Sequence, residues 1–199
     1  MLITPQDGGW QPLAPSALPH LPQEAPPTAM TLADIEQVKK DFIYTAQQAQ
    51  AMGIEALELH AAHGYLMHQF LSPLANQRSD AYGGSFENRI RFVMEVFADV
   101  RQVFKGALGI RISGTDWVEG GWSVDDAVRL AGVAGQAGVE TRLDVFPEMQ
   151  HVFQIAVGRQ KHDRDFAGTR IVAQPIDELN SVDSGQYVVD NDQRRQLIV

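Results

Sequence analysis

Apolar residues recur at three- and four-residue intervals in three stretches of the chain, the spacing that places them on one face of an α-helix. The first helix is expected to begin after Thr31, where Asp34 completes a capping box, and to stop at Gly53. The second helix is expected after Ser85, and the third after Ser123, where Asp126 stands in capping-box position. The apolar stripe of the first helix comprises Leu32, Ile35, Val38, Phe42, Ala46 and Ala49, and that of the second comprises Phe86, Ile90, Val93, Phe97, Val100 and Phe104.

Short apolar runs with strand character alternate with these helices. They cover residues 54–60, 108–113 and 140–146. Strands that alternate with helices are typical of a parallel sheet whose strands are joined by crossover helices, so we expect an α/β fold. Residues 155–199 contain only scattered apolar pieces among charges, and we assign no element there.

Two of the predicted strands carry polar side chains on one face near their carboxyl ends. Glu58 and His60 share one face of the first strand, and Arg111 and Ser113 share one face of the second. A central parallel strand is usually apolar on both faces. These polar positions therefore predict a ligand-binding mouth at the carboxyl edge of the sheet, as in a (β/α)₈ barrel or an open α/β sheet.

The segments outside these elements are also informative. Most of the ten prolines lie in residues 1–30, which are expected to wrap over the rest of the chain as an extended arm. Residues 61–84 connect the first predicted strand to Ser85. This connection is long compared with the usual loop between a strand and a helix, which has ~2–6 residues.

Within this connection, the stretch NQRSDAYGGSFENR indicates a structural role. Its charged and amide side chains can tie a long loop to the start of the second helix, and two glycines can form the tight turn before it. The residues concerned are Asn76, Arg78, Asp80 and Arg89, with Gly83 and Gly84 in the turn.

Composition narrows the class of protein. A chain of 199 residues with 44% hydrophobic and 21% charged residues is expected to form a soluble globular domain. The net charge of -9 argues against nucleic acid or an anionic membrane as partner. The absence of cysteine excludes disulfides and thiol chemistry, and the N-terminus lacks the pattern of a signal peptide. We therefore expect a cytoplasmic protein.

The segment HAAHGYLMHQF, residues 60–70, concentrates three histidines and a tyrosine behind the first predicted strand. His60 and His63 could share a metal ion on a helix, but a strand end lacks that geometry and no carboxylate lies at a familiar ligand spacing. We therefore expect no metal site. The plainest alternative to a catalytic site is a hydrogen-bonded core residue at His60, with His63 and His68 on a solvated loop.

Longer stretches of sequence bear on that choice. ALELHAAHGYLMHQFLSPLANQRSDAYGGSFENRIRFV and the later LGIRISGTDWVEGGW closely resemble the old yellow enzyme family of flavin-dependent ene-reductases, which are (β/α)₈ barrels that bind FMN. GGWQPLAPSALPH and MTLADIEQVKKDF resemble the segment just upstream in that family. The resemblance runs from about residue 4 to residue 122. It implies a partial TIM barrel of about three strands with crossover helices.

The resemblance implies roles for four residues. His60 and His63 match the pair that hydrogen-bonds the activating carbonyl or nitro oxygen of an α,β-unsaturated substrate. Tyr65 matches the proton donor to the α-carbon, and Arg111 matches the residue that lies against the reduced flavin. His60 is expected to contact the flavin as well, and NAD(P)H is expected to be the reductant.

The resemblance also implies missing parts. A complete barrel takes about 250 residues and eight strands, and its phosphate-binding loops follow strands 7 and 8. GVAGQAG, at residues 132–138, does not fit a Gly-rich nucleotide-binding motif. The chain is therefore expected to bind FMN weakly or not at all. Two open sheet edges are expected to be shielded by formation of a homo-oligomer.

A second resemblance begins where the first ends. SVDDAVRLAGVAGQAGVETRLDVFPEMQHVFQ, residues 123–154, resembles the C-terminal helix, last strand and histidine loop of hormone-sensitive-lipase-like α/β-hydrolases. That resemblance implies a catalytic base at His151, although the chain has no GxSxG nucleophile motif.

The two resemblances divide the chain into four segments, as in a fusion of two truncated proteins. The segments are an arm at 1–30, a partial barrel at 31–122, a hydrolase-like piece at 123–154 and an unassigned tail at 155–199. Three functions stay open. They are an ene-reductase, a carboxylesterase-like hydrolase that uses His151, and a non-catalytic oligomeric chimera.

Overall fold

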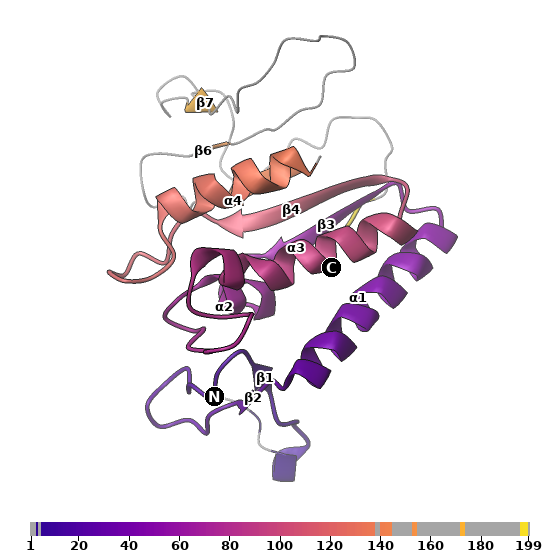
Figure 1. Ribbon diagram of the computed structural model, residues 1–199. Coiled ribbons are helices and arrows are strands. Elements are labelled where there is room, and N and C mark those ends of the chain that lie inside the picture. The colour runs from indigo at the N-terminus through magenta and orange to yellow at the C-terminus, as the bar shows by residue number, and fades with distance from the viewer. Residues whose placement is uncertain are drawn as a thin grey trace, which may run out of the picture.

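The computed structural model describes residues 3, 5–137, 140–144, 153–154, 172–173 and 196–198 (Figure 1). Its main sheet has the strand order β5-β4-β3-β8, and every neighbouring pair is parallel. The strands are β3 (Ala56–Ala61), β4 (Ala107–Ser113), β5 (Glu140–Asp144) and β8 (Gln196–Ile198). The predicted alternation of parallel strands and crossover helices is therefore confirmed.

Strand β8 differs from the sequence analysis, which assigned no element after residue 154. Its backbone pairs with residues 56–58 of β3, so the edge of β3 that we expected to be open is covered along half of the strand. A strand of three residues gives no periodic signal in the sequence, because a period cannot be measured over so short a length. Pairing with a distant strand, rather than local sequence, defines this element.

Three long helices follow the predicted boundaries closely. They are α1 (Leu32–Ala51), α3 (Phe86–Val103) and α4 (Val124–Gln136). Thr31 forms the predicted capping box with Asp34, and Ser123 forms one with Asp126. The Ser85 hydroxyl accepts from the backbone of Asn88. Each box satisfies backbone donors that the helix itself leaves unpaired. Local sequence therefore sets where these helices begin.

A short helix, α2 (Leu66–Leu71), lies in the long connection between β3 and α3, where the sequence pattern predicts no helix. It buries Met67, His68, Phe70 and Leu71 against the core. The spacing of the apolar residues in LMHQFL is helical, but a single turn and a half is below the length at which periodicity predicts a helix. His68 is consequently buried, and not on a solvated loop.

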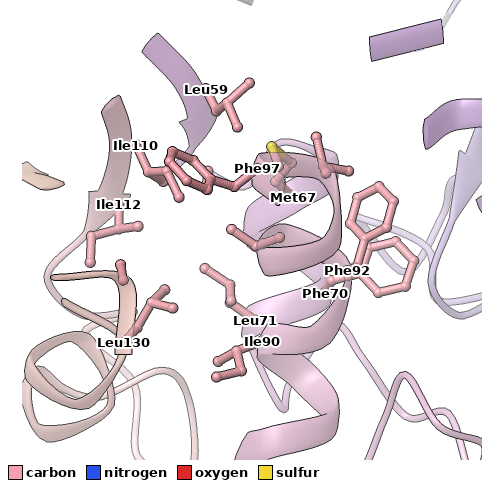
Figure 2. Close-up of a cluster of buried hydrophobic side chains, with 14 of the residues drawn as sticks. Leu59, Met67, Phe70, Leu71, Ile90, Phe92, Phe97, Ile110, Ile112 and Leu130 are labelled. Carbon is pink, nitrogen blue, oxygen red and sulfur yellow. The ribbon is translucent and has the colours of Figure 1, made fainter. Parts of the chain in front are cut away.

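The helices cover one face of the sheet. Leu57 and Leu59 of β3 and Ile110 and Ile112 of β4 join side chains from α1, α2, α3 and α4 in one core cluster. Figure 2 shows residues of β3 and β4 beside Phe97 of α3 and residues of α2. The other face of β3 and β4 carries the polar residues that the strand pattern indicated, and it stays partly open.

The apolar stripes behave as predicted, with one exception. All six stripe residues of the second helix are buried. In α1, Ile35, Ala46 and Ala49 are buried, and Val38 and Phe42 pack against the core. Leu32, however, is 55% exposed. It is the first residue of α1, at the end of the stripe, so the prediction that it packs with the others is wrong.

The N-terminal arm contains a little more regular structure than expected. It comprises a 3-10 turn (Pro5–Asp7) and two short parallel strands, β1 (Leu13–Ala14) and β2 (Thr28–Ala29). The guanidinium of Arg78 donates hydrogen bonds to the carbonyls of Pro15 and Met30 and forms an ion pair with Asp80. The long connection is therefore fastened to the arm as well as to itself. Strands β6 (Phe153–Gln154) and β7 (Val172–Ala173) form a separate antiparallel pair.

The charged loop also has the structural role that the sequence indicated. The guanidinium of Arg89, on α3, donates to the carbonyls of Leu71 and Gly84 and approaches Asp126 of α4 at 3.5 Å. Gly84 has a φ of 80°, in the left-handed region that glycine adopts without strain. These contacts join the end of α2, the turn and two long helices.

Asn76 is the residue of this loop whose removal should cost most stability. It is 3% exposed, and its amide nitrogen donates to the carbonyls of Phe70 and Tyr82, each at 2.7 Å. Asn76→Ala leaves these buried acceptors unpaired, so we expect the free energy of unfolding to fall by about 2–4 kcal/mol. Urea denaturation measures this change. Gln77→Ala, at the exposed neighbouring position, should change it by less than about 0.5 kcal/mol.

Candidate active site

The candidate site lies at the carboxyl ends of β3 and β4, on the face away from the helices. His60 of β3 and Arg111 of β4 are direct neighbours in the strand pairing. Their side chains therefore leave the sheet side by side on the same face. The strand pattern predicted this juxtaposition from sequence, and the pairing register supplies it.

The segment after His60 turns sharply back toward it. His63 and Gly64 both have left-handed backbones, with φ values of 60° and 77°. The His63 amide donates to the hydroxyl of Ser113, at the end of β4, at 3.0 Å. Tyr65 then caps the N-terminus of α2 without using its side chain for the cap. The turn therefore directs three aromatic side chains into one region.

That region holds three of the residues singled out by sequence. The ring centres of His60 and His63 are 5.0 Å apart, and those of His60 and Tyr65 are 5.2 Å apart. The side chain of Tyr65 is 63% exposed, so its phenol can meet a ligand from solution. Two imidazoles and a phenol thus stand together beside the guanidinium of Arg111. All four side chains can donate hydrogen bonds.

Glu58 is a fifth member of the site, to which the sequence analysis gave no role. Its carboxylate oxygen lies 2.8 Å from Nε of Arg111, and both side chains are largely buried. At this distance the two opposite charges attract, which keeps the guanidinium next to Glu58. The signal was present in the sequence, because Glu58 and His60 share one face of the strand.

A second group of polar residues contacts the turn through the backbone amide of Gly64. His68 of α2 is 7% exposed, and its Nδ1 accepts a hydrogen bond from the Gly64 amide at 2.8 Å. Its Nε2 lies 3.0 Å from a carboxylate oxygen of Asp116. The other oxygen of Asp116 accepts from the Ser72 hydroxyl at 2.6 Å and from the Trp122 amide at 2.7 Å. Sequence reasoning missed this group, since its members are up to 58 positions apart.

These hydrogen bonds change the acidity of Asp116. Burial alone would raise the pKa of its carboxyl, but donors from His68, Ser72 and the Trp122 backbone hold that pKa below its ordinary value of 3.8. A carboxyl with a lowered pKa in the folded state contributes stability above its unfolded pKa, and this contribution is lost as the pH falls through the lower, folded-state pKa. Asp116 therefore stabilises the fold at neutral pH and ceases to do so in acid.

Replacing Asp116 by asparagine tests whether this carboxylate stabilises the fold at neutral pH and not in acid. We expect Asp116→Asn to lower the free energy of unfolding at pH 7 by about 1–3 kcal/mol, as for loss of hydrogen bonds to a charged group. The difference from the unsubstituted protein should shrink as the pH falls below 3.8. Glu119→Gln, an exposed carboxylate in the same loop, is the control. A difference that is constant between pH 7 and pH 3 would contradict the assignment.

His151, the residue of the hydrolase resemblance, lies outside the described residues, as does most of the segment around it. Within the described part of the chain, no three histidine, aspartate or glutamate side chains are grouped so that they could hold a metal ion. No helix there is long and apolar enough to cross a membrane.

Comparison with known proteins agrees with the geometry. The model of the NADH:flavin oxidoreductase / NADH oxidase family matches residues 4–193. The NADPH dehydrogenase of Geobacillus thermodenitrificans is 42% identical over 159 residues, which cover 74% of this chain and 47% of that protein. The NADPH dehydrogenase of Bacillus velezensis is 40% identical over 158 residues, with the same shares covered.

Solved structures give the same answer for the fold. Morphinone reductase in complex with tetrahydroNAD matches with a TM-score of 0.62 at 33% identity, over 71% of this chain and 45% of that one. The old yellow enzyme of Pichia sp. AKU4542 matches with a TM-score of 0.60 at 33% identity, over 68% of this chain and 41% of that one. The structural neighbours are TIM barrels, and the chain resembles part of one.

The fold and the comparisons together place this chain in the class of (β/α)₈-barrel flavin oxidoreductases. The chain belongs to the NADH:flavin oxidoreductase / NADH oxidase family, which confirms the old-yellow-enzyme resemblance of its N-terminal part. It spans about half the length of the curated relatives that it matches. The matched region continues beyond Ser123, where the hydrolase resemblance was expected to begin. That second resemblance stays a prediction.

Proposed function

We propose that this chain is an FMN-dependent NAD(P)H oxidoreductase that reduces activated C=C bonds, and that His60, His63, Tyr65 and Arg111 form its site. The observation that carries the proposal is the cluster of two imidazoles and a phenol, with ring centres 5.0 and 5.2 Å apart, beside the strand position of Arg111. Family membership supports the class of cofactor and reductant.

The two histidines act on the substrate's activating group. An imidazole N–H from each of His60 and His63 donates a hydrogen bond to a carbonyl or nitro oxygen conjugated with the C=C bond. Withdrawing electron density through that oxygen makes the β-carbon electrophilic. A pair of donors at 5.0 Å between ring centres can converge on a single oxygen.

Tyr65 completes the addition across the double bond. Its phenol donates a proton to the α-carbon, a general-acid role, and solvent can restore that proton because the side chain is exposed. The α-carbon gains the proton, the β-carbon gains a hydride, and NAD(P)H is oxidised to NAD(P)⁺. The product is the saturated carbonyl or nitro compound.

Arg111 and its surroundings fit one edge of FMN. The pyrimidine edge of a flavin presents carbonyl and ring-nitrogen acceptors, and it becomes anionic on reduction. The guanidinium of Arg111, whose Nε lies 2.8 Å from Glu58, supplies matching donors and positive charge, and His60 lies next to it in the sheet. FMN, when bound, supplies the hydride for the β-carbon.

An assay of the full chain tests the proposal. The protein is incubated without oxygen with added FMN, NADPH and 2-cyclohexenone, and cyclohexanone is measured by gas chromatography. We expect product that requires both protein and FMN. Product no greater than in a mixture of FMN and NADPH without protein would contradict the proposal.

The same sample separates the other predicted functions. If the chain hydrolyses an activated ester, and the His151→Ala variant loses this activity, the hydrolase function is favoured. Cyclohexenone reduction should be the same with and without the His151→Ala substitution. Absence of both activities would favour a non-catalytic chimera.

Among the described residues, β8 leaves residues 59–61 of β3 unpaired at that edge of the sheet, which supports the prediction of a homo-oligomer, since an unpaired strand edge can pair with another chain. Light scattering checks it in the same preparation, where a stable monomer would contradict it.

A further inference from the structure

We propose that His68 is a positioning residue for the site, which holds the turn at His63 and Gly64 in the shape that brings the His63 imidazole and the Tyr65 phenol next to His60. This inference rests on the proposed function for its catalytic consequence, although its structural part can be tested without it. The supporting contacts are made by the backbone amides of the turn and by the loop after β4.

The contacts of His68 fix which of its nitrogens carries the proton. Nδ1 accepts a hydrogen bond from the Gly64 amide at 2.8 Å, so Nδ1 itself bears no hydrogen. The ring proton is therefore on Nε2, which lies 3.0 Å from a carboxylate oxygen of Asp116. The His68 ring thus joins the turn to the loop after β4.

Asp116 is held in turn from two directions. The hydroxyl of Ser72, at the end of α2, and the amide of Trp122 both donate to one of its oxygens. The indole N–H of Trp122 donates to the carbonyl of Ser113 at 2.9 Å. A buried carboxylate with this number of donors is fixed in place, and it fixes the imidazole that contacts it.

The turn needs such support. His63 has a φ of 60°, a left-handed conformation that costs a residue other than glycine roughly 1–2 kcal/mol. Two successive amides are held by side chains: that of His63 by Ser113 and that of Gly64 by His68. If the His68 acceptor is lost, the turn can relax to an unstrained backbone. The His63 and Tyr65 side chains would then leave His60.

The plain alternative is that His68 only fills space in the core, where it is buried with other residues of α2. Three substitutions separate the two roles. In His68→Asn the side-chain oxygen can take the place of Nδ1 and accept from the Gly64 amide. In His68→Gln the amide nitrogen can take the place of Nε2 and reach Asp116, but the acceptor for Gly64 is lost. His68→Phe fills the volume and makes neither bond.

Two measurements on the full-length chain are needed. Hydrogen exchange of the Gly64 amide, followed by NMR, reports the turn directly and requires no flavin. We expect exchange in His68→Asn within about threefold of the unsubstituted protein, and at least about tenfold faster exchange in His68→Gln and His68→Phe, as for loss of one hydrogen bond. The apparent kcat for cyclohexenone should fall about 10-fold or more in the same two variants, with the KM for NADPH unchanged.

The outcomes are distinct. Equal Gly64 exchange in His68→Asn and His68→Phe would overturn the proposal, since the restored acceptor would then have no effect. Faster exchange in His68→Gln and His68→Phe with unchanged kcat would also overturn it, because the turn would not govern the chemistry. If the unsubstituted chain reduces no cyclohexenone, the proposed function fails, and the exchange pattern still decides whether His68 holds the turn.

Discussion

Tyr65→Phe is expected to lower the rate of cyclohexenone reduction by about 10²–10⁴-fold, the usual contribution of a positioned general acid. The substitution removes only the phenolic oxygen. The ring stays within reach of His60, to which its centre lies at 5.2 Å, so binding of the substrate should change little. The loss should therefore appear in kcat more than in KM.

Measuring the rate with a second electron acceptor, dioxygen, separates proton donation by Tyr65 from the other steps of the reaction. Consumption of NADPH with dioxygen as acceptor requires no proton at a substrate carbon, so Tyr65→Phe should leave that rate within about twofold. Tyr44→Phe is the matched control, because Tyr44 is 61% exposed on α1 and Tyr65 is 63% exposed. Equal losses with cyclohexenone and dioxygen would contradict a proton-donor role for Tyr65.

Arg111→Ala is expected to weaken FMN binding by about 10–100-fold, which corresponds to the loss of charge-assisted hydrogen bonds to the flavin edge. The substitution also leaves the Glu58 carboxylate in the site without the guanidinium that lies 2.8 Å from it, and a negative charge there opposes a reduced, anionic ring. Flavin fluorescence during titration measures the affinity.

Lys105→Ala is the matched control for Arg111→Ala. It removes the same charge from an exposed position just before β4, at the opposite end of that strand from the site. The affinity of the Lys105→Ala variant for FMN should stay within about twofold of that of the unsubstituted protein. Equal weakening in both variants would mean that net charge, and not the position of Arg111, governs binding.

Sequence predicted best those features that depend on neighbours along the chain. The capping boxes at Thr31 and Ser123 lie within four residues, and both form as expected. The polar faces of β3 and β4 follow from the two-residue period of a strand, which is why His60 and Arg111 could be placed together before the register was known.

Features that depend on distant pairing escaped the sequence analysis. Strand β8 exists because its backbone pairs with β3, more than a hundred residues away. His68 and Asp116 meet only once α2 and the loop after β4 have packed together. The sequence alone does not indicate that these two residues interact, because nothing in it shows which of the three nearby histidines has a carboxylate partner. The contacts of His68 and Asp116 that support the turn could therefore be identified only from the tertiary structure.

Whether these residues form a flavin site in this chain decides whether the proposed oxidoreductase is correct. The decisive measurement is a titration of the purified full chain with FMN, followed by flavin fluorescence. We predict a saturable change with one FMN per chain, but weak binding, because the loops that bind the phosphate in a complete barrel are expected to be missing. No change with FMN in hundredfold excess over protein would contradict the proposed oxidoreductase and leave the strand-end residues as an inherited scaffold.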